Sequence, residues 1–158
     1  MVVELLVEGA FGGVFWSLVG LALSRFVRDV LGRVLLAGVL IAAAAFYVVF
    51  AAGADAGPAW LAVEVLGVLL FGGMAVLGIR RSPYWLAAGW ALHPVWDIVL
   101  HNIGPGRAFA PEPYTIACLS WDLLTAALIA VAYGTGFVGG RRGRTGRTEP
   151  VAAGVDVP

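Results

Sequence analysis

Imidazole and carboxylate side chains recur at four-residue spacing within one apolar segment of the chain. His93, Asp97 and His101 follow one another at this spacing, and they include both histidines of the protein. Residues four apart lie on one face of an α-helix, so these three are fanned over roughly 80°. Imidazole and carboxylate groups bind divalent metals and act as general acids and bases. The pattern predicts a functional site on one helix face.

Other groups of the same chemistry lie in neighbouring apolar segments. Cys118 and Asp122 are again four residues apart, Glu64 lies in an earlier segment, and Glu8 is near the start of the chain. We expect Asp122 and Glu64 to join the site. Cys118 is a further candidate, with a small buried hydrophobic side chain as the alternative. Glu8 is also a candidate, although its position is shallow enough to reach water.

The elements that must position these residues are membrane-spanning helices. The 158-residue chain is 61% hydrophobic and only 13% charged, which is too apolar for a soluble domain of this size. A helix needs about 20 apolar residues to cross a bilayer. Five segments qualify, at about Val3–Ser24, Val34–Ala52, Pro58–Ile79, Tyr84–His101 and Tyr114–Phe137. We expect an all-α, multi-pass bundle in the cell membrane, with the lipid bilayer as its main partner.

The positions of the arginines predict an orientation for this bundle. Nine of the ten basic residues fall on one side of the membrane if the five segments alternate in direction, and only Arg107 falls on the other. Positive residues favour the cytoplasmic side. The N-terminus is therefore expected outside and the C-terminus in the cytoplasm. The zero net charge gives no reason to expect a nucleic-acid partner.

Two further features concern the ends of the chain. Residues 1–138 are expected to form the transmembrane domain, and residues 139–158 a disordered cytoplasmic tail rich in Arg and Gly. The first residues carry Glu4 and Glu8 and no positive charge, which argues against a cleaved signal peptide. Gly9 and Gly13 form a small-xxx-small step. It indicates close packing inside the bundle, with a homo-oligomer as the alternative.

Depth estimates bring the polar residues of the last two segments together. At about 1.5 Å per residue, Asp97 and Cys118 lie about 9 and 7 Å from the outer helix ends. His93 and Asp122 lie about 15 and 13 Å deep on the same scale. Because these segments are antiparallel, we expect His93 beside Asp122 and Asp97 beside Cys118.

The remaining ionisable residues also fall in the outer half of the predicted spans. Glu64 lies about 9 Å from its outer end, whereas His101 and Glu8 are shallower. Scattered polar positions would not separate in this way between the two halves of the bilayer. We therefore expect one polar cluster in the outer half and none in the inner half.

A cation is the simplest explanation for such a cluster. A charged side chain near the centre of a membrane helix costs roughly 2.5–3.5 kcal/mol, and no Arg or Lys lies within the predicted spans. The alternative is a purely structural network in which His and Asp share a proton. The predicted ligands of a divalent metal, with zinc as the first candidate, are His93, Asp97, His101 and Asp122.

The stretch from Gly57 to Asp122 resembles a family of small prokaryotic integral membrane proteins known only as a domain of unknown function. The resemblance is carried by GPAWLAVEV, GWALHPVWDIVLH, a proline-rich loop and CLSWD. It implies that the acidic residue of the third segment, the LHxxWDxxxH motif and the CxxxD motif belong to one site, but it implies no activity. Likeness to membrane hydrolases of the alkaline ceramidase type is an analogy, since this chain has fewer spans and lacks a third histidine.

These observations favour a metal-dependent membrane enzyme that hydrolyses a lipid-like or isoprenoid substrate. Glu64 and Asp97 would be its catalytic carboxylates, with Glu64 orienting a water or acting as the general base. One alternative is a proton- or ion-coupled carrier, in which the same groups titrate during transport. Another is a membrane subunit whose polar cluster binds a partner helix.

Overall fold

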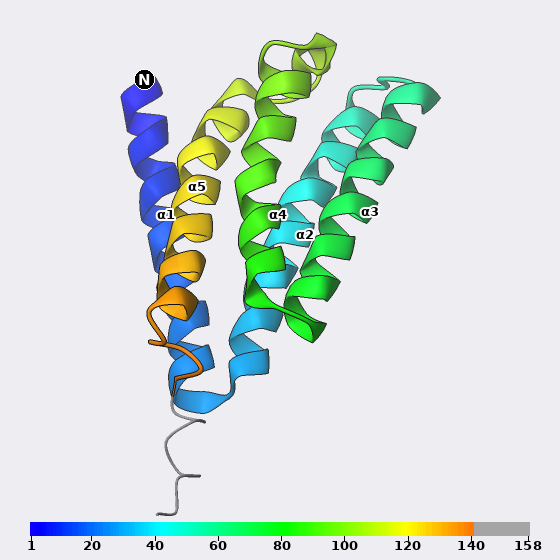
Figure 1. Cartoon of the computed structure of the whole chain (residues 1–158). Coiled ribbons are helices and arrows are strands. Elements are labelled where there is room, and N and C mark those ends of the chain that lie inside the picture. The colour runs from blue at the N-terminus through cyan, green and yellow to red at the C-terminus, as the bar shows by residue number, and fades with distance from the viewer. Residues whose placement is uncertain (141–158) are drawn as a thin grey trace, which may run out of the picture.

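The computed structural model describes residues 1–140, and this part of the chain is helical with short connections (Figure 1). The five long helices are α1 (Val2–Ala22), α2 (Asp29–Gly53), α3 (Pro58–Arg80), α4 (Pro83–Trp96) and α5 (Glu112–Gly134). Three shorter elements are the π-helices η1 (Leu23–Val27) and η2 (Asp97–Asn102) and the 3₁₀-helix η3 (Pro105–Ala108). Most of the predicted tail, residues 141–158, lies outside the described residues.

Four helical segments are long and apolar enough to cross a membrane. They are Val2–Val27, Asp29–Gly53, Pro58–Arg80 and Glu112–Gly134. The remaining predicted span, the fourth, corresponds to α4 and η2, which have 14 and 6 residues and follow each other without a break. The all-helical fold is confirmed, and the change of helix type at Asp97 divides the fourth segment.

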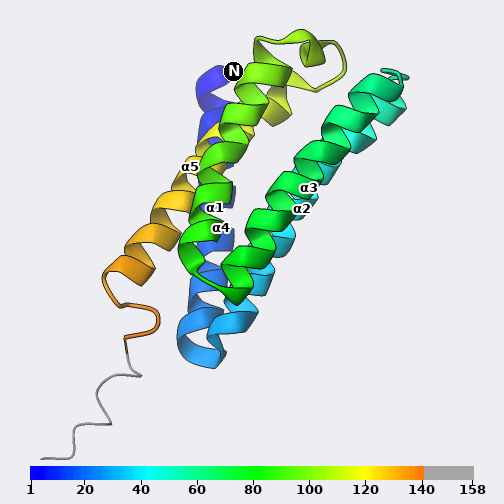
Figure 2. The same cartoon turned by 45° about the vertical axis from the view of Figure 1, so that its right-hand side comes forward.

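The helices are arranged with α4 at the centre of one side of the bundle. In Figures 1 and 2, α4 stands between α5 and α2, α1 runs along α5, and α3 lies beside α2. The fully buried apolar side chains come from four of the helices. They include Leu36 and Leu40 of α2, Phe71 of α3, Trp90 of α4 and Ile129 of α5. Large apolar side chains such as Leu69 and Val49 point outward and are more than half exposed.

The glycines of α1 allow this helix to pack closely against α5. A Cβ atom on Gly13 would lie 2.6 Å from the carbonyl oxygen of Trp121, and one on Gly12 would overlap the Trp121 indole. Gly9 faces the backbone of Ala117 in the same way. The small-xxx-small step of Gly9 and Gly13 therefore packs inside this chain, as the first of the two interpretations predicts.

The end of the bundle at which α2 begins carries charges that lie outside the predicted spans. Helix α2 begins at Asp29 rather than near Val34, because Asp29 and Arg33 pair one turn apart. The Tyr133 hydroxyl donates a hydrogen bond to Asp29 at 2.6 Å, and Arg33 reaches the Gly78 carbonyl oxygen at 3.4 Å. Asp29 and Arg33 thus form a charged pair in the first turn of α2, before the start of the predicted span Val34–Ala52.

Close packing of α1 on α5 makes a stability prediction. Gly13→Ala should lower the free energy of unfolding by about 1–3 kcal/mol, since the added methyl group meets the α5 backbone. Gly72→Ala on α3 is the matched control. Its Cβ has nothing within 4 Å, so this change should be neutral or stabilise the protein by up to about 1 kcal/mol. Unfolding in mixed detergent micelles measures both, and equal effects of the two variants would contradict the packing argument.

Candidate metal centre

The site begins with a local change in the helix that carries most of its residues. Pro94 lies inside α4 and cannot donate a backbone hydrogen bond, and the π-helix η2 starts three residues later at Asp97. In this segment the Ile103 N–H donates to the Ile98 carbonyl oxygen, five residues back, at 2.9 Å. Segments of this kind are frequent at functional sites. A π-helical turn contains more residues than an α-helical turn, so residues four apart no longer lie on the same face of the helix.

Three buried residues from two neighbouring segments meet at the centre of the bundle. The Nδ1 atom of His93 lies 2.9 Å from Oδ2 of Asp122 and 3.5 Å from Oδ2 of Asp97. All three side chains are at most 1% exposed. These two atoms form a hydrogen bond, in which the imidazole is the donor when Nδ1 carries its proton. The structure thus places His93 beside Asp122, as the depth estimate predicts.

His101 and Glu64 form a second buried pair next to this group. The Nε2 atom of His101 lies 3.0 Å from Oε1 of Glu64, and both side chains are at most 1% exposed. The pair joins η2 to α3. The structure therefore separates His101 from the other predicted ligands and gives it a carboxylate partner of its own. The wider turn of η2 is the local reason, since it rotates His101 away from the direction that a regular α-helix predicts.

Tyr47 of α2 connects the two pairs and was not among the predicted site residues. Its ring stacks on His101 with centroids 3.9 Å apart and an interplanar angle of 12°, and it lies 6.2 Å from the His93 ring. Phe71 covers another side of His93, at 4.8 Å between ring centroids. Tyr47 stands alone in a run of Ala, Val and Phe, so no spacing pattern marks it. Its burial beside both histidines appears only in three dimensions.

Several polar atoms of the site are buried without a hydrogen-bond partner. Such atoms are costly in an apolar interior, at roughly 1–3 kcal/mol each by mutational data. Their number at one place indicates that the site is built to hold a further group. The atoms are Nε2 of His93, both carboxylate oxygens of Asp97, Oδ1 of Asp122, Nδ1 of His101 and the hydroxyl of Tyr47.

The donor set fits a divalent metal ion. One ligand atom each from His93, Asp97 and Asp122 lies within 4.8 Å of the others, and all three residues are buried. No arginine forms an ion pair with these carboxylates in the described part of the chain. A 2+ ion would neutralise both carboxylates, and three protein ligands leave a position free for water or substrate, as in catalytic sites.

The other two candidate residues lie differently. Cys118 is half-buried on α5, one turn from Asp122, and lines an apolar groove with it. Glu8 is exposed on α1, the helix that supplies no residue to either buried pair. The structure therefore brings Cys118 to the edge of the cluster and leaves Glu8 apart from it.

The connection between η2 and α5 covers the second pair, His101 and Glu64. Gly106 of η3 lies so close to His101 that an added Cβ would be 2.7 Å from its ring, and Phe109 stacks edge-on to His101 at 5.8 Å. Phe109 also contacts Trp60 of α3 at 5.2 Å. A polar cavity of about 240 Å³ opens beside this cover, lined by His101, Asn102, Arg107, Ala110 and Glu112. Water can thus approach His101 from the end of the bundle.

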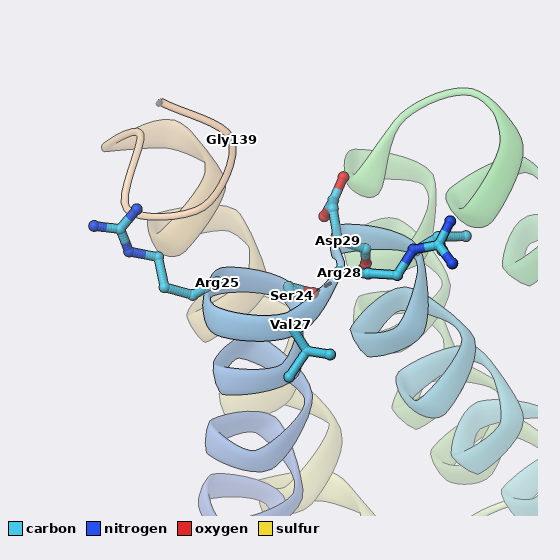
Figure 3. A pocket seen from close by; sticks show the side chains of 7 residues that line it. Ser24, Arg25, Val27, Arg28, Asp29 and Gly139 are labelled. Carbon is cyan, nitrogen blue, oxygen red and sulfur yellow. Dashed lines mark hydrogen bonds between the residues drawn. The ribbon is translucent and has the colours of Figure 1, made fainter. Parts of the chain in front are cut away.

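A larger cavity, of about 440 Å³, lies at the opposite end, where η1 turns into α2. Figure 3 shows Arg25 and Arg28 pointing to opposite sides of this turn, with Ser24 and Val27 between them. The two guanidinium groups do not converge on a common point. The cavity therefore lacks the arrangement of groups that a catalytic site requires, and the buried cluster is the better candidate.

The comparison with known proteins agrees with the resemblance found in the sequence. A family of unknown function (DUF6010) matches residues 9–138, which include both buried pairs. No curated protein and no solved structure matches the chain. The expected membership of an uncharacterised family is confirmed, and the chemistry must be argued from the site itself.

The His101–Glu64 pair makes a prediction about coupling. Glu64→Leu and His101→Leu should each lower the free energy of unfolding by about 1–3 kcal/mol, because each leaves its partner buried and unpaired. The double variant should cost less than the sum of the two. Glu8→Leu, which removes an exposed acid, is the control and should have little effect. Strictly additive losses in unfolding titrations would show that the two side chains do not interact.

Proposed function

We propose that this chain, which belongs to the family of unknown function DUF6010, is a metal-dependent membrane enzyme. It would hydrolyse a lipid-like or isoprenoid substrate at the buried cluster. His93, Asp97 and Asp122 would hold a divalent ion, with zinc as the first candidate. Glu64 and His101 would form the acid–base pair of the reaction.

One observation carries this proposal. Two carboxylates and an imidazole are fully buried together, four of their polar atoms lack partners, and no basic side chain pairs with them in residues 1–140. A structural network would be expected to satisfy its own hydrogen bonds. Unpaired acceptors around a small space instead favour a cation, and the free position on that cation favours catalysis over a closed structural site.

The second pair suits the transfer of a proton. A bound divalent ion supplies Lewis acidity, which polarises a carbonyl group and makes a water more acidic. Glu64 can accept a proton through His101, whose Nε2 it faces at 3.0 Å. The other ring nitrogen of His101 is buried without a partner and is available to a water. The Tyr47 ring holds His101 in place by stacking, and its free hydroxyl can donate to a substrate oxygen.

The location of the site supports a substrate from the outer leaflet. We propose five membrane spans, in which α4 and η2 together form the fourth, with the N-terminus outside and the C-terminus in the cytoplasm. Arg25, Arg28 and Arg33 at the η1–α2 end support this orientation, as do Arg80 and Arg81 after α3. The buried pairs then lie nearer the outer surface, beneath the η3 connection.

The metal proposal predicts which variants lose the ion. Protein purified in mild detergent should contain about one divalent ion per chain, and His93→Ala or Asp122→Ala should lower the metal affinity at least about tenfold. His101→Gln and Glu64→Gln should keep the ion and lose turnover, because they belong to the second pair. Elemental analysis after dialysis measures the occupancy. A wild-type protein free of metal, with a stability that chelators do not change, would refute the proposal.

The orientation predicts the behaviour of reporter fusions. A fluorescent protein that folds only in the cytoplasm should be bright at the C-terminus and dark when the chain is cut after Ala56, in the α2–α3 connection. Alkaline phosphatase, which is active only outside, should give the opposite result at both positions. Bright fluorescence at Ala56 would reverse the proposed topology.

A further inference from the structure

Helices α2 and α5 enclose an apolar groove on the outside of the bundle. Its volume is about 170 Å³, and the surface it exposes is apolar. In Figures 1 and 2, α4 stands between these two helices. The lining residues are Val39, Ala42, Ala43 and Phe46 of α2, and Tyr114, Cys118, Trp121 and Asp122 of α5.

The groove borders the buried cluster at Asp122. Phe46 and Tyr114 flank one end, with ring centroids 5.8 Å apart, and the Tyr114 hydroxyl donates a hydrogen bond to the Ala43 carbonyl oxygen at 3.0 Å. Asp122 lines the other end, although its side chain is only 1% exposed and contacts His93. The groove therefore brings an apolar surface next to a residue of the cluster, while the carboxylate itself stays buried.

The size of the groove selects one hydrocarbon chain. A cavity of about 150 Å³ holds a single benzene molecule, so 170 Å³ holds one stretch of alkyl or isoprenoid chain and not the two chains of a diacyl lipid. Ala42 and Ala43 leave this space, which larger side chains at these positions would fill. In a bilayer the groove gains no hydrophobic attraction, because lipid tails are equally apolar. The fit of one chain to the groove, together with the polar end of the molecule, must therefore supply the preference over lipid tails.

The charges at the cluster select an uncharged polar end. Asp97 and Asp122 already balance a 2+ ion, and no basic side chain pairs with this group within residues 1–140. Arg107 is exposed and lines the separate cavity beside η3. A carboxylate or phosphate brought to the end of the groove would have no positive partner left, whereas a neutral carbonyl oxygen needs only the free metal position and a hydrogen-bond donor.

We infer that the α2–α5 groove admits the substrate sideways from the bilayer, as a single hydrocarbon chain that ends in a neutral carbonyl group such as an ester. The chain lies between Ala42 and Cys118, and the carbonyl reaches the group of His93 and Asp122. This inference rests on the proposed function, because the metal is what holds the polar end. The route itself depends only on the shape of the groove.

Photo-crosslinking in lipid nanodiscs tests the route. The probe is the methyl ester of a palmitic acid that carries a diazirine in its chain, added at increasing mole fraction and irradiated. Adducts on α5 near Cys118 should saturate at low mole fraction, since one chain fills the groove. Adducts at Leu69 of α3, which is 67% exposed, should rise in proportion to the probe. A linear rise at both places would overturn the inference.

Two tryptophan variants provide the matched comparison. Ala42→Trp fills the groove from an exposed position and should lower the saturable labelling near Cys118 by about tenfold. Ala127→Trp adds the same side chain at an exposed position of α5 outside the groove and should leave the labelling unchanged. Equal labelling in both variants would also overturn the inference. Thermal unfolding of each variant checks that the fold is intact. If Ala42→Trp does not fold, the smaller substitution Ala42→Leu is used in the same crosslinking experiment.

Further arms separate the parts of the proposal. An isoprenoid ester probe with the same diazirine shows which chain the groove prefers, and saturation by either supports the route. Stronger saturable labelling by the free acid than by its ester would overturn the neutral polar end. Metal content is measured on the same preparations. Saturable labelling in protein without metal would refute the proposed enzyme and leave the groove as a chain-binding site. Bound metal without saturable labelling would refute the groove as the route and leave the proposed enzyme.

Discussion

The burial of two carboxylates with a single imidazole is the constraint on which the rest of this structure depends. Asp97, Asp122 and His93 are removed from solvent, and no basic side chain pairs with them in the described residues. The surrounding helices must therefore both exclude water and bring these groups within a few ångströms of one another. The cation that we propose here would offset this cost by its binding energy.

The bundle meets this constraint through departures from regular helix packing. Pro94 and the π-helix that follows it divide the polar residues of one continuous segment between two partners, Asp122 on α5 and Glu64 on α3. Tyr47 from α2 fills the space between the two histidines. Four different helices thus contribute to the site, and none of them could hold it alone. The connection between η2 and α5 then covers His101 through Gly106 and Phe109.

The sequence predicts much of this arrangement because the bilayer limits what the chain can do. Helix number, approximate bounds and the pairing of His93 with Asp122 follow from hydropathy and from the rise per residue. The pairing of His101 with Glu64 does not follow from the sequence. A regular α-helix points His101 in another direction than the wider turn of η2 does. The sequence does not identify Tyr47 as a site residue for a different reason. A single aromatic residue in an apolar segment shows no spacing that relates it to the polar residues. The start of α2 was placed too late because hydropathy excludes a charged pair such as Asp29 and Arg33.

Helix α1 contributes no ligand, yet it determines how the wall beside Asp122 is supported. The Trp121 indole lies over the bare backbone of Gly12 and at the same time lines the groove. Any side chain on that glycine would push the ring toward α2 and narrow the passage. Helix α1 therefore limits the width of the groove through Trp121, although no residue of α1 lines the groove. Changes on the far side of the bundle can then alter selectivity without altering a single reactive atom.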